Sequence, residues 1–283
     1  MSRTLFISDL DGTLLGPDGR LTQTTVSLLN HAISRGILFS VATARTPATV
    51  SELMRDVNLQ IPAVVMTGGA LWDKASGRYS EVQFFDPSQI PAVVEAYRAS
   101  GAGAFLYTLP PTESGRDVFH IYHVGNFAPE EKEFMQDRLG SPFKRFSIPE
   151  SGDSQLPEEI GDAVLFFGIQ PNAEANAAYA RLKKIPRINP MLYHDWRGDE
   201  IAEIEAFPYT TTKAQGIKRL ARMVGADRIV VYGDNLNDLS MMAAADYSVA
   251  VSNAVEEVKR EVDEVIGSNA FDAVPRHILG FRD

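Results

Sequence analysis

Short apolar strands that alternate with amphipathic helices constrain the fold of this chain more than any other feature. In the first 66 residues, compact apolar runs predict strands, and hydrophobic residues at helical spacing predict the helices between them. The predicted order is strand 5–8, helix 22–35, strand 37–42, helix 47–57 and strand 61–66. One helix between each pair of strands is typical of right-handed crossovers, so this order predicts a parallel sheet and an α/β fold.

The middle of the chain has a different pattern, in which strands and helices are separated by longer polar loops. The predicted elements are strands at 105–107, 118–122 and 163–169, a helix at 176–184, and a loop at 140–156. Aromatic and β-branched residues in the first two strands favour an antiparallel sheet. The acidic run Glu130–Glu133 predicts a solvated helix face. We therefore expect an inserted α+β domain at 83–206.

From Lys213 onward the alternation of helices and strands resumes. The predicted elements are helices at 213–224, 237–244 and 255–262, and strands at 228–232 and 247–251. Residues 1–82 and 207–283 are thus predicted to form one discontinuous core domain, a doubly wound parallel sheet of Rossmann-like type. The middle block is inserted into this core as a cap domain.

Composition excludes several classes of protein. The chain has 283 residues and no Cys, which rules out disulfides, thiolate metal sites and cysteine nucleophiles. With 27 Lys and Arg against 37 Asp and Glu, its net charge of −10 argues against a general nucleic-acid binder. No apolar run approaches the roughly 20 residues of a membrane span, and the amino terminus lacks the layout of a signal peptide. We expect a cytoplasmic protein, monomer or dimer, without nucleic-acid or membrane partners.

Two acidic clusters follow predicted strands. Asp9 and Asp11 come directly after strand 5–8, and Asp234 and Asp238 follow strand 228–232. Open α/β sheets bind ligands at the carboxyl ends of their strands. Carboxylate and amide oxygens, without His or Cys, are the ligands that Mg²⁺ selects. A turn or a helix cap would explain either cluster alone, but two clusters at one sheet edge predict a cation site.

Groups that suit an anion lie near the same predicted edge. Thr43 follows strand 37–42 and offers a hydroxyl, with Arg45 two residues further on. Lys213 offers an ammonium at the start of a helix, where the helix terminus itself favours anions. Each is unremarkable alone, but together with the acidic clusters they predict a phosphate site beside a carboxylate and a metal.

These residues resemble the four motifs of the haloacid dehalogenase (HAD) superfamily. The motifs are Asp9-Leu10-Asp11-Gly12-Thr13-Leu14, Thr43, Lys213 and Gly233-Asp234-Asn235-Leu236-Asn237-Asp238. Their order and spacing, with the insert between the second and third, are similar to those of the Cof-type, class IIB sugar phosphatases. The resemblance spans residues 5 to about 265, and the predicted cap contains no recognisable motif.

The resemblance implies a phosphatase that forms an aspartyl-phosphate. In this superfamily the first motif supplies the nucleophile, Asp9 here, and a general acid that later acts as a base, Asp11 here. Mg²⁺ is expected between the Asp9 carboxylate, the Asp11 backbone carbonyl and Asp234. The other implied residues are Thr43, Lys213 and Asn237 as phosphate ligands, with Asp238, Arg45 and Gly12 in supporting positions. The implied substrate is a small-molecule phosphate ester, such as a sugar phosphate.

Three positions depart from the family pattern. Ala44 stands where Gly is usual, and Ala214 follows Lys213 where Gly is common. In Thr67-Gly68-Gly69-Ala70, Gly68 replaces the Asn of the usual Asn-Gly-Ala. None of these changes removes a catalytic group. The Gly68 change removes an amide side chain from the expected substrate contacts.

Two other features and two other functions compete with this interpretation. His120 and His123 are three residues apart on a strand and so point to opposite faces, which favours structural or surface roles over a metal pair. The patch His194–Arg197 is either part of a substrate cleft or an exposed hairpin tip. A hexose-phosphate phosphomutase would use the same Asp9 chemistry. A non-catalytic metabolite-binding module would be expected to lose Asp9, Asp11 or Asp234, and all three are present.

Overall fold

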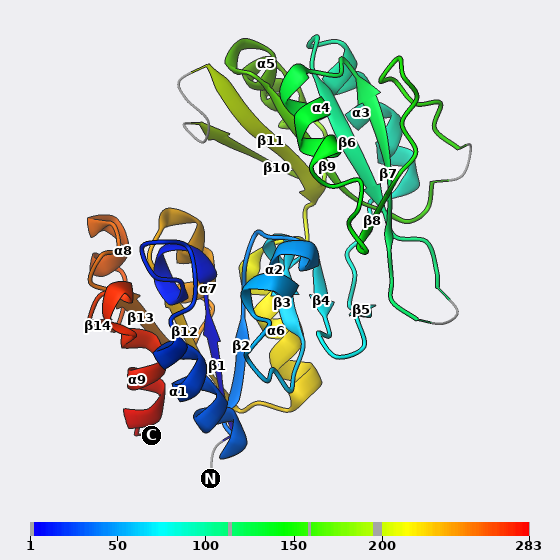
Figure 1. Ribbon diagram of the computed structural model, residues 1–283. Coiled ribbons are helices and arrows are strands. Elements are labelled where there is room, and N and C mark those ends of the chain that lie inside the picture. Colours follow the sequence, from blue (N-terminus) through cyan, green and yellow to red (C-terminus); the bar gives the residue numbers. More distant parts are fainter. Residues whose placement is uncertain (1–2, 113–114, 158–159, 195–199, 283) are drawn as a thin grey trace. The chain divides into compact units, whose positions relative to one another are not determined.

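The computed structural model describes residues 3–112, 115–157, 160–194 and 200–282 (Figure 1). The chain divides into two compact units, one made of Met1–Glu81 with Thr212–Asp283 and the other of Val82–Thr211. Residues 82 and 207–211 group with the second unit, whereas the sequence placed them in the core domain. Each unit has its own sheet.

The first unit is built on a parallel sheet with the strand order β14-β13-β12-β1-β2. Its strands are β1 (Thr4–Ser8), β2 (Leu38–Val41), β12 (Arg228–Gly233), β13 (Tyr247–Val251) and β14 (Glu264–Ile266). Every neighbouring pair in this sheet is parallel. The chain passes from β1 to β2 toward one edge of the sheet, and from β12 to β13 toward the opposite edge. Because such crossovers are right-handed, this reversal places helices on both faces, which confirms the predicted doubly wound core.

The α-helices described in the first unit are α1 (Gln23–Ser34), α2 (Pro47–Leu53), α6 (Lys213–Val224), α7 (Leu239–Met242), α8 (Glu256–Arg260) and α9 (Ala273–Gly280), and two of them begin at a threonine side-chain cap. The Thr22 hydroxyl accepts a hydrogen bond from the Thr25 amide at the start of α1. Thr212 does the same for Gln215 at the start of α6, which ends at Gly225 with φ of 63°. The helix predicted at 237–244 is shorter than expected, since Leu236–Asp238 forms a 3₁₀ turn before α7.

The third predicted strand does not continue the parallel sheet. Strand β3 (Ala63–Val65) pairs antiparallel with β4 (Ala70–Trp72), which pairs antiparallel with β5 (Tyr79–Ser80). Within the described residues, an isolated parallel bridge between Ala42 and Val64 is the pairing that links β3 to the main sheet. The reason lies in the turn Met66–Gly68, where all three residues have positive φ and reverse the chain.

The second unit contains a mixed sheet with the strand order β10-β11-β9-β6-β7-β8. Its strands are β6 (Gly103–Thr108), β7 (Phe119–Gly125), β8 (Lys144–Phe146), β9 (Ala163–Pro171), β10 (Ile188–His194) and β11 (Ile201–Pro208), and its helices are α3 (Ile90–Arg98), α4 (Pro129–Gln136) and α5 (Asn172–Leu182). The core contains Val93 and Tyr97 of α3, Leu182 of α5, Phe166 of β9 and Ile204 of β11. The antiparallel pairing predicted for this block is observed everywhere except between β7 and β8, which are parallel.

Three sequence expectations in this unit need correction or fall outside the structure. Part of the predicted loop 140–156 is strand β8, which is too short to give an alternating pattern. Glu131 is fully buried and is not part of a solvated face: its carboxylate lies 3.0 Å from His123 Nε2 and accepts a hydrogen bond from the Ile169 amide. Residues Asp195–Arg197 lie outside the described residues, and His194 is exposed at the end of β10.

Glu205 of β11 is a buried carboxylate on the sheet face opposite the core residue Ile204. Among the described residues, its Oε2 has no hydrogen-bond partner. Burial, with a smaller contribution from Glu203, raises the pKa of Glu205 to about 8. The folded state therefore holds a proton on Glu205 more tightly than the unfolded chain does, and its contribution to stability is lost as the pH rises toward 8.

We predict that Glu205→Gln raises the free energy of unfolding by about 1 to 3 kcal/mol at pH 9 and changes it little at pH 4.5. The reason is that glutamine has no charge to bury at the higher pH. Urea unfolding at both pH values measures this difference, with the exposed Glu95→Gln as the matched control. An equal effect of Glu205→Gln at both pH values would contradict the prediction.

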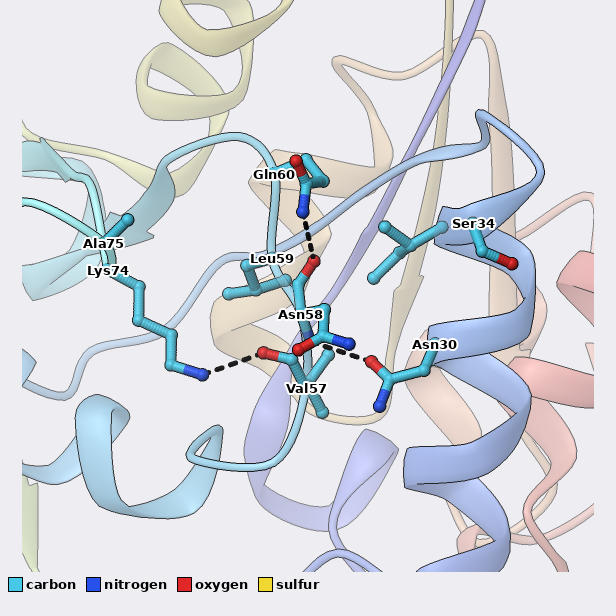
Figure 2. A pocket seen from close by; sticks show the side chains of 9 residues that line it. Asn30, Ser34, Val57, Asn58, Leu59, Gln60, Lys74 and Ala75 are labelled. Carbon is cyan, nitrogen blue, oxygen red and sulfur yellow. Dashed lines mark hydrogen bonds between the residues drawn. The ribbon is translucent and has the colours of Figure 1, made fainter.

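A cavity of about 590 Å³ lies in the first unit, lined by residues of α1 and of the segment that precedes β3 (Figure 2). Several of its polar groups form hydrogen bonds to the backbone or to each other. Lys74 Nζ donates to the carbonyls of Met54 and Val57 at 2.7 and 2.8 Å, and Asn30 Oδ1 accepts from the Asn58 amide. This cavity lies at the amino ends of the strands, away from the acidic residues described next.

Candidate active site

Three neighbouring strands bring the predicted site residues to one edge of the parallel sheet. Asp9 follows β1, Asp234 follows β12, and Thr43 comes two residues after β2. The Asp9 amide donates to the Tyr232 carbonyl at 2.9 Å, and the Ala42 amide donates to the Ser8 carbonyl at 2.9 Å. The strands therefore end side by side, and the carboxyl edge predicted from the sequence exists in the structure.

Lys213 joins two of the acidic residues. Its Nζ lies 2.6 Å from Asp9 Oδ1 and 2.7 Å from Asp238 Oδ1, and its side chain is only 2% exposed. An ammonium has three donors, so one remains for a phosphate oxygen. Burial alone would lower the pKa of Lys213, but Asp9 and Asp238 hold it above its usual value. Lys213 is thus a permanent positive charge beside the Asp9 carboxylate.

Asp238 is fully buried and is held by the loop as well as by Lys213. Its Oδ2 accepts hydrogen bonds from the backbone amides of Asp234 and Asn235, at 3.0 and 3.2 Å. Both carboxylate oxygens are therefore engaged by the protein. This geometry fits a residue that fixes Lys213 and the turn after β12.

Asp234 faces the turn that follows β1. The Thr13 hydroxyl donates to Asp234 Oδ1 at 2.7 Å. Gly12 has φ of 75°, and a Cβ placed there would lie 2.3 Å from Asp234 Oδ2. Gly12 is therefore required both for the turn and for the close approach of Asp234.

The site has an excess of negative charge. Burial, with a smaller contribution from Asp238, raises the pKa of Asp9 to about 7 against the opposing effect of Lys213. Burial also raises the pKa of Asp234, with Asp238 and Asp11 adding to the shift. The raised pKa values mean that the protein offsets the negative charge of these two carboxylates only in part. A bound cation would stabilise their charged form.

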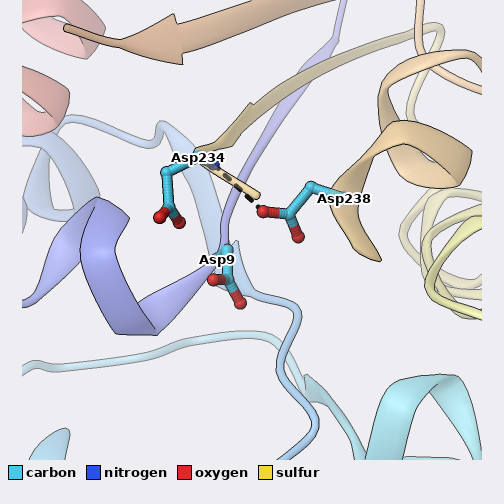
Figure 3. Close-up of side chains that lie close together, drawn as sticks. All are labelled: Asp9, Asp234 and Asp238. Carbon is cyan, nitrogen blue, oxygen red and sulfur yellow. Dashed lines mark hydrogen bonds between the residues drawn. The ribbon is translucent and has the colours of Figure 1, made fainter. Parts of the chain in front are cut away.

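The donor set fits a hard divalent cation. Asp9, Asp234 and Asp238 each offer a carboxylate oxygen, and these oxygens lie within 4.8 Å of one another (Figure 3). All the donors are oxygens, which is the ligand type that Mg²⁺ prefers. Because Asp238 is already engaged, Asp9 and Asp234 are the carboxylates best placed to hold such an ion.

The Asp11 side chain does not point toward a shared carboxylate cluster. Its two oxygens accept hydrogen bonds from Arg45, one from Nε and one from Nη2, both at 2.7 Å. Both side chains are partly exposed. Arg45, predicted as a supporting residue, thus contacts the expected acid and base directly.

Thr43 and the turn Met66–Gly68 form a second wall of the site. Thr43 is buried, its hydroxyl accepts a hydrogen bond from the Arg45 amide, and its carbonyl accepts one from the Thr67 amide. A Cβ on Gly68 would lie 2.1 Å from the Thr212 carbonyl oxygen. Gly68 is therefore a close-packing position beside the start of α6, and no larger side chain fits there without movement.

The structure places the remaining residues as follows. Asn237, a predicted phosphate ligand, is exposed in the 3₁₀ turn, and within the described residues its amide makes no hydrogen bond to the other site residues. Sequence reasoning gave no role to Thr13 or to Asn253, whose amide donates to the Gly12 carbonyl at 2.7 Å. Asn253 follows β13, so the rule that polar residues after strands line the site would have identified it.

The chain belongs to the haloacid dehalogenase-like hydrolase family, whose model matches residues 6–278. This match confirms the resemblance carried by the four motifs. It also confirms the predicted fold class and, together with the phosphatases that the chain resembles, the prediction of a HAD-type phosphatase. Within the described residues, no helix is long and apolar enough to cross a membrane.

Similar proteins include two phosphatases and a solved structure. The chain is 25% identical over 276 residues to the 5-amino-6-(5-phospho-D-ribitylamino)uracil phosphatase YwtE of Bacillus subtilis, covering 92% of each protein. It is 22% identical to the pyridoxal phosphate phosphatase YbhA of Escherichia coli, covering 98% of each. The structure of the HAD subclass IIB sugar phosphatase BT4131 superposes with a TM-score of 0.69 at 20% identity, covering 99% of both chains. That similarity supports the fold.

Proposed function

We propose that this protein is a Mg²⁺-dependent, cytoplasmic phosphomonoester hydrolase that acts on a small phosphorylated metabolite. The observation that carries the proposal is the contact of Lys213 with both Asp9 and Asp238, beside the second carboxylate Asp234. A buried carboxylate, an ammonium with a free donor and a cation site next to one another are what phosphoryl transfer to a carboxylate requires. The similar proteins act on small phosphate esters, which supports the substrate class.

The reaction proceeds in two steps on Asp9. In the first step, an Asp9 carboxylate oxygen forms a bond to phosphorus, the bond from phosphorus to the ester oxygen breaks, and Asp11 gives its proton to that oxygen. In the second step, a water oxygen forms a bond to the phosphorus of the aspartyl-phosphate and gives a proton to Asp11. The bond from phosphorus to the Asp9 oxygen breaks, which releases inorganic phosphate and restores the Asp9 carboxylate. The proton that Asp11 gives up is thus replaced within one turnover.

Positive charge makes this attack possible. Lys213 and the Thr43 hydroxyl bind the phosphoryl oxygens, and the Asp9 and Asp234 carboxylates with the Asp11 backbone carbonyl would hold Mg²⁺. When bound, this ion supplies positive charge that offsets the repulsion between the carboxylate and a dianionic phosphate. Asp238 keeps Lys213 in place through its hydrogen bonds to the loop. We propose Asn237 as a further phosphate contact.

We expect phosphate release from small esters to require a divalent cation. The test is a panel of sugar phosphates, pyridoxal phosphate and p-nitrophenyl phosphate, each assayed with Mg²⁺ and with a chelator. Chelation should remove most of the activity, because the charge of Asp9 and Asp234 is then uncompensated. Product analysis separates hydrolysis from mutase chemistry. An isomeric hexose phosphate without free phosphate, or full activity in the chelator, would contradict the proposal.

A further inference from the structure

Arg45 contacts Asp11 through a pair of hydrogen bonds with a well-defined geometry. Its guanidinium meets Asp11 with two parallel hydrogen bonds, from Nε to Oδ2 and from Nη2 to Oδ1, both at 2.7 Å. This fork is the strongest common geometry for an arginine and a carboxylate, and it fixes the plane as well as the position of the carboxylate. A lysine, which is a point charge, would not hold that plane.

Both partners of this pair are anchored through their backbones to the site. The Arg45 amide donates to the Thr43 hydroxyl at 3.1 Å, and its carbonyl accepts from the Met66 amide at 3.1 Å. Asp11 lies in the turn Leu10–Leu14, which is closed by a hydrogen bond from the Leu15 amide to the Leu10 carbonyl. The hydrogen bond to Asp11 raises the pKa of Arg45, so the guanidinium stays charged. The pair therefore links the turn after β1 to the segment after β2.

We propose that Arg45 is a positioning residue that orients Asp11 for proton transfer to the leaving group. This inference rests on the proposed function, in which Asp11 is the general acid of the first step. The residues proposed to contact the phosphoryl group itself are Lys213, Thr43 and Asn237. The Arg45 fork, by contrast, has its Nε and one terminal nitrogen committed to Asp11.

The role follows from where charge develops in the first step. As the bond from phosphorus to the ester oxygen breaks, the proton moves from the Asp11 carboxyl group to that oxygen, and Asp11 becomes an anion. The guanidinium faces the position where this negative charge appears, so it stabilises the product of the proton transfer. A leaving group that departs as a stable anion needs little of this help, whereas an alkoxide needs much of it.

The test compares two substrates in wild type and in three variants. The substrates are p-nitrophenyl phosphate, whose leaving group is a stable phenolate, and the sugar phosphate that the wild type hydrolyses fastest. The variants are Arg45→Ala, Arg45→Lys, and Arg35→Ala as an exposed arginine control at the end of α1. In Arg45→Ala we expect kcat for the sugar phosphate to fall about tenfold or more, and kcat for the aryl ester to fall several-fold less. Arg45→Lys should restore part of the loss, and Arg35→Ala should change neither rate.

A double-mutant cycle of Arg45→Ala with Asp11→Asn tests whether Arg45 acts through Asp11. If Arg45 acts through Asp11, Arg45→Ala should no longer change the ratio of the two rates once Asp11 is replaced. An equal loss for both substrates, or a change in KM alone, would overturn the positioning role and leave Arg45 as a phosphate-binding or structural residue. The positioning role would also be overturned if Arg45→Ala changed the ratio of the two rates by the same factor in the Asp11→Asn background as in the wild type.

The wild-type assay separates this inference from the proposal on which it rests. Phosphate release by the wild type supports the proposed function, whatever effect Arg45→Ala has on the two rates. If the wild type releases no phosphate from either ester, the proposed function fails, and the role of Arg45 fails with it.

Discussion

Asp9→Asn is expected to abolish phosphate release, with a loss on the order of 10³-fold or more for every ester that the wild type hydrolyses. An amide cannot form the bond to phosphorus, so the reaction has no first step. The variant should remain folded, because asparagine replaces a buried carboxylate whose charged form is disfavoured by burial. The measurement is phosphate release with Mg²⁺ at saturating substrate.

Two controls make the Asp9 result interpretable. Circular dichroism and urea unfolding show whether Asp9→Asn keeps the fold, and the exposed Asp56→Asn should retain full activity. Retention of more than about a tenth of the wild-type rate in Asp9→Asn would contradict the assignment of the nucleophile.

Lys213→Met is expected to reduce both stability and activity. Methionine keeps most of the volume of the side chain but leaves Asp9 and Asp238 buried without their common positive charge. Removing one partner of a buried ion pair costs about 3 to 5 kcal/mol, so the free energy of unfolding should fall by that amount at neutral pH. Phosphate release should fall on the order of 10²-fold or more, because the phosphoryl group loses an ammonium ligand.

The matched control for this change is Lys218→Met, an exposed lysine on the same helix, α6. It should alter the free energy of unfolding by no more than about 0.5 kcal/mol and leave activity unchanged. Unfolding is measured in the chelator, so that a bound cation does not mask the lost charge. Equal stability of Lys213→Met and Lys218→Met would rule out the role given to this ion pair.

Regular elements of the core could be predicted because their patterns are local. The apolar runs of β1, β12 and β13 and the period of α6 are visible in sequence, and parallel pairing follows from their order. The reversal after β3 is different. It depends on positive φ at Met66 and Thr67, residue types that rarely adopt it. The Gly68-Gly69 pair is a turn signal, but it does not indicate that the chain already reverses at Met66.

Contacts between distant residues set the other limit of prediction. Glu131 lies in a run of charged residues, yet it is buried because the Ile169 amide and His123 meet its carboxylate across the second unit. In the site, Lys213 and Asp9 are 204 positions apart. The sequence could place both at one edge of the sheet, but it could not predict the direct contact between them. No sequence signal indicated the contact between Arg45 and Asp11, although both residues were predicted to belong to the site.

The most direct test of the account is to find the phosphoryl group on Asp9. Wild-type protein is mixed with Mg²⁺ and the fastest substrate of the panel, quenched in acid within one turnover, and digested for peptide mass spectrometry. The account predicts one phosphoryl group on the peptide that contains Asp9, and none in Asp9→Asn. Active wild-type protein in which no phosphoryl group is trapped, or one in which it sits on another residue, would contradict the account.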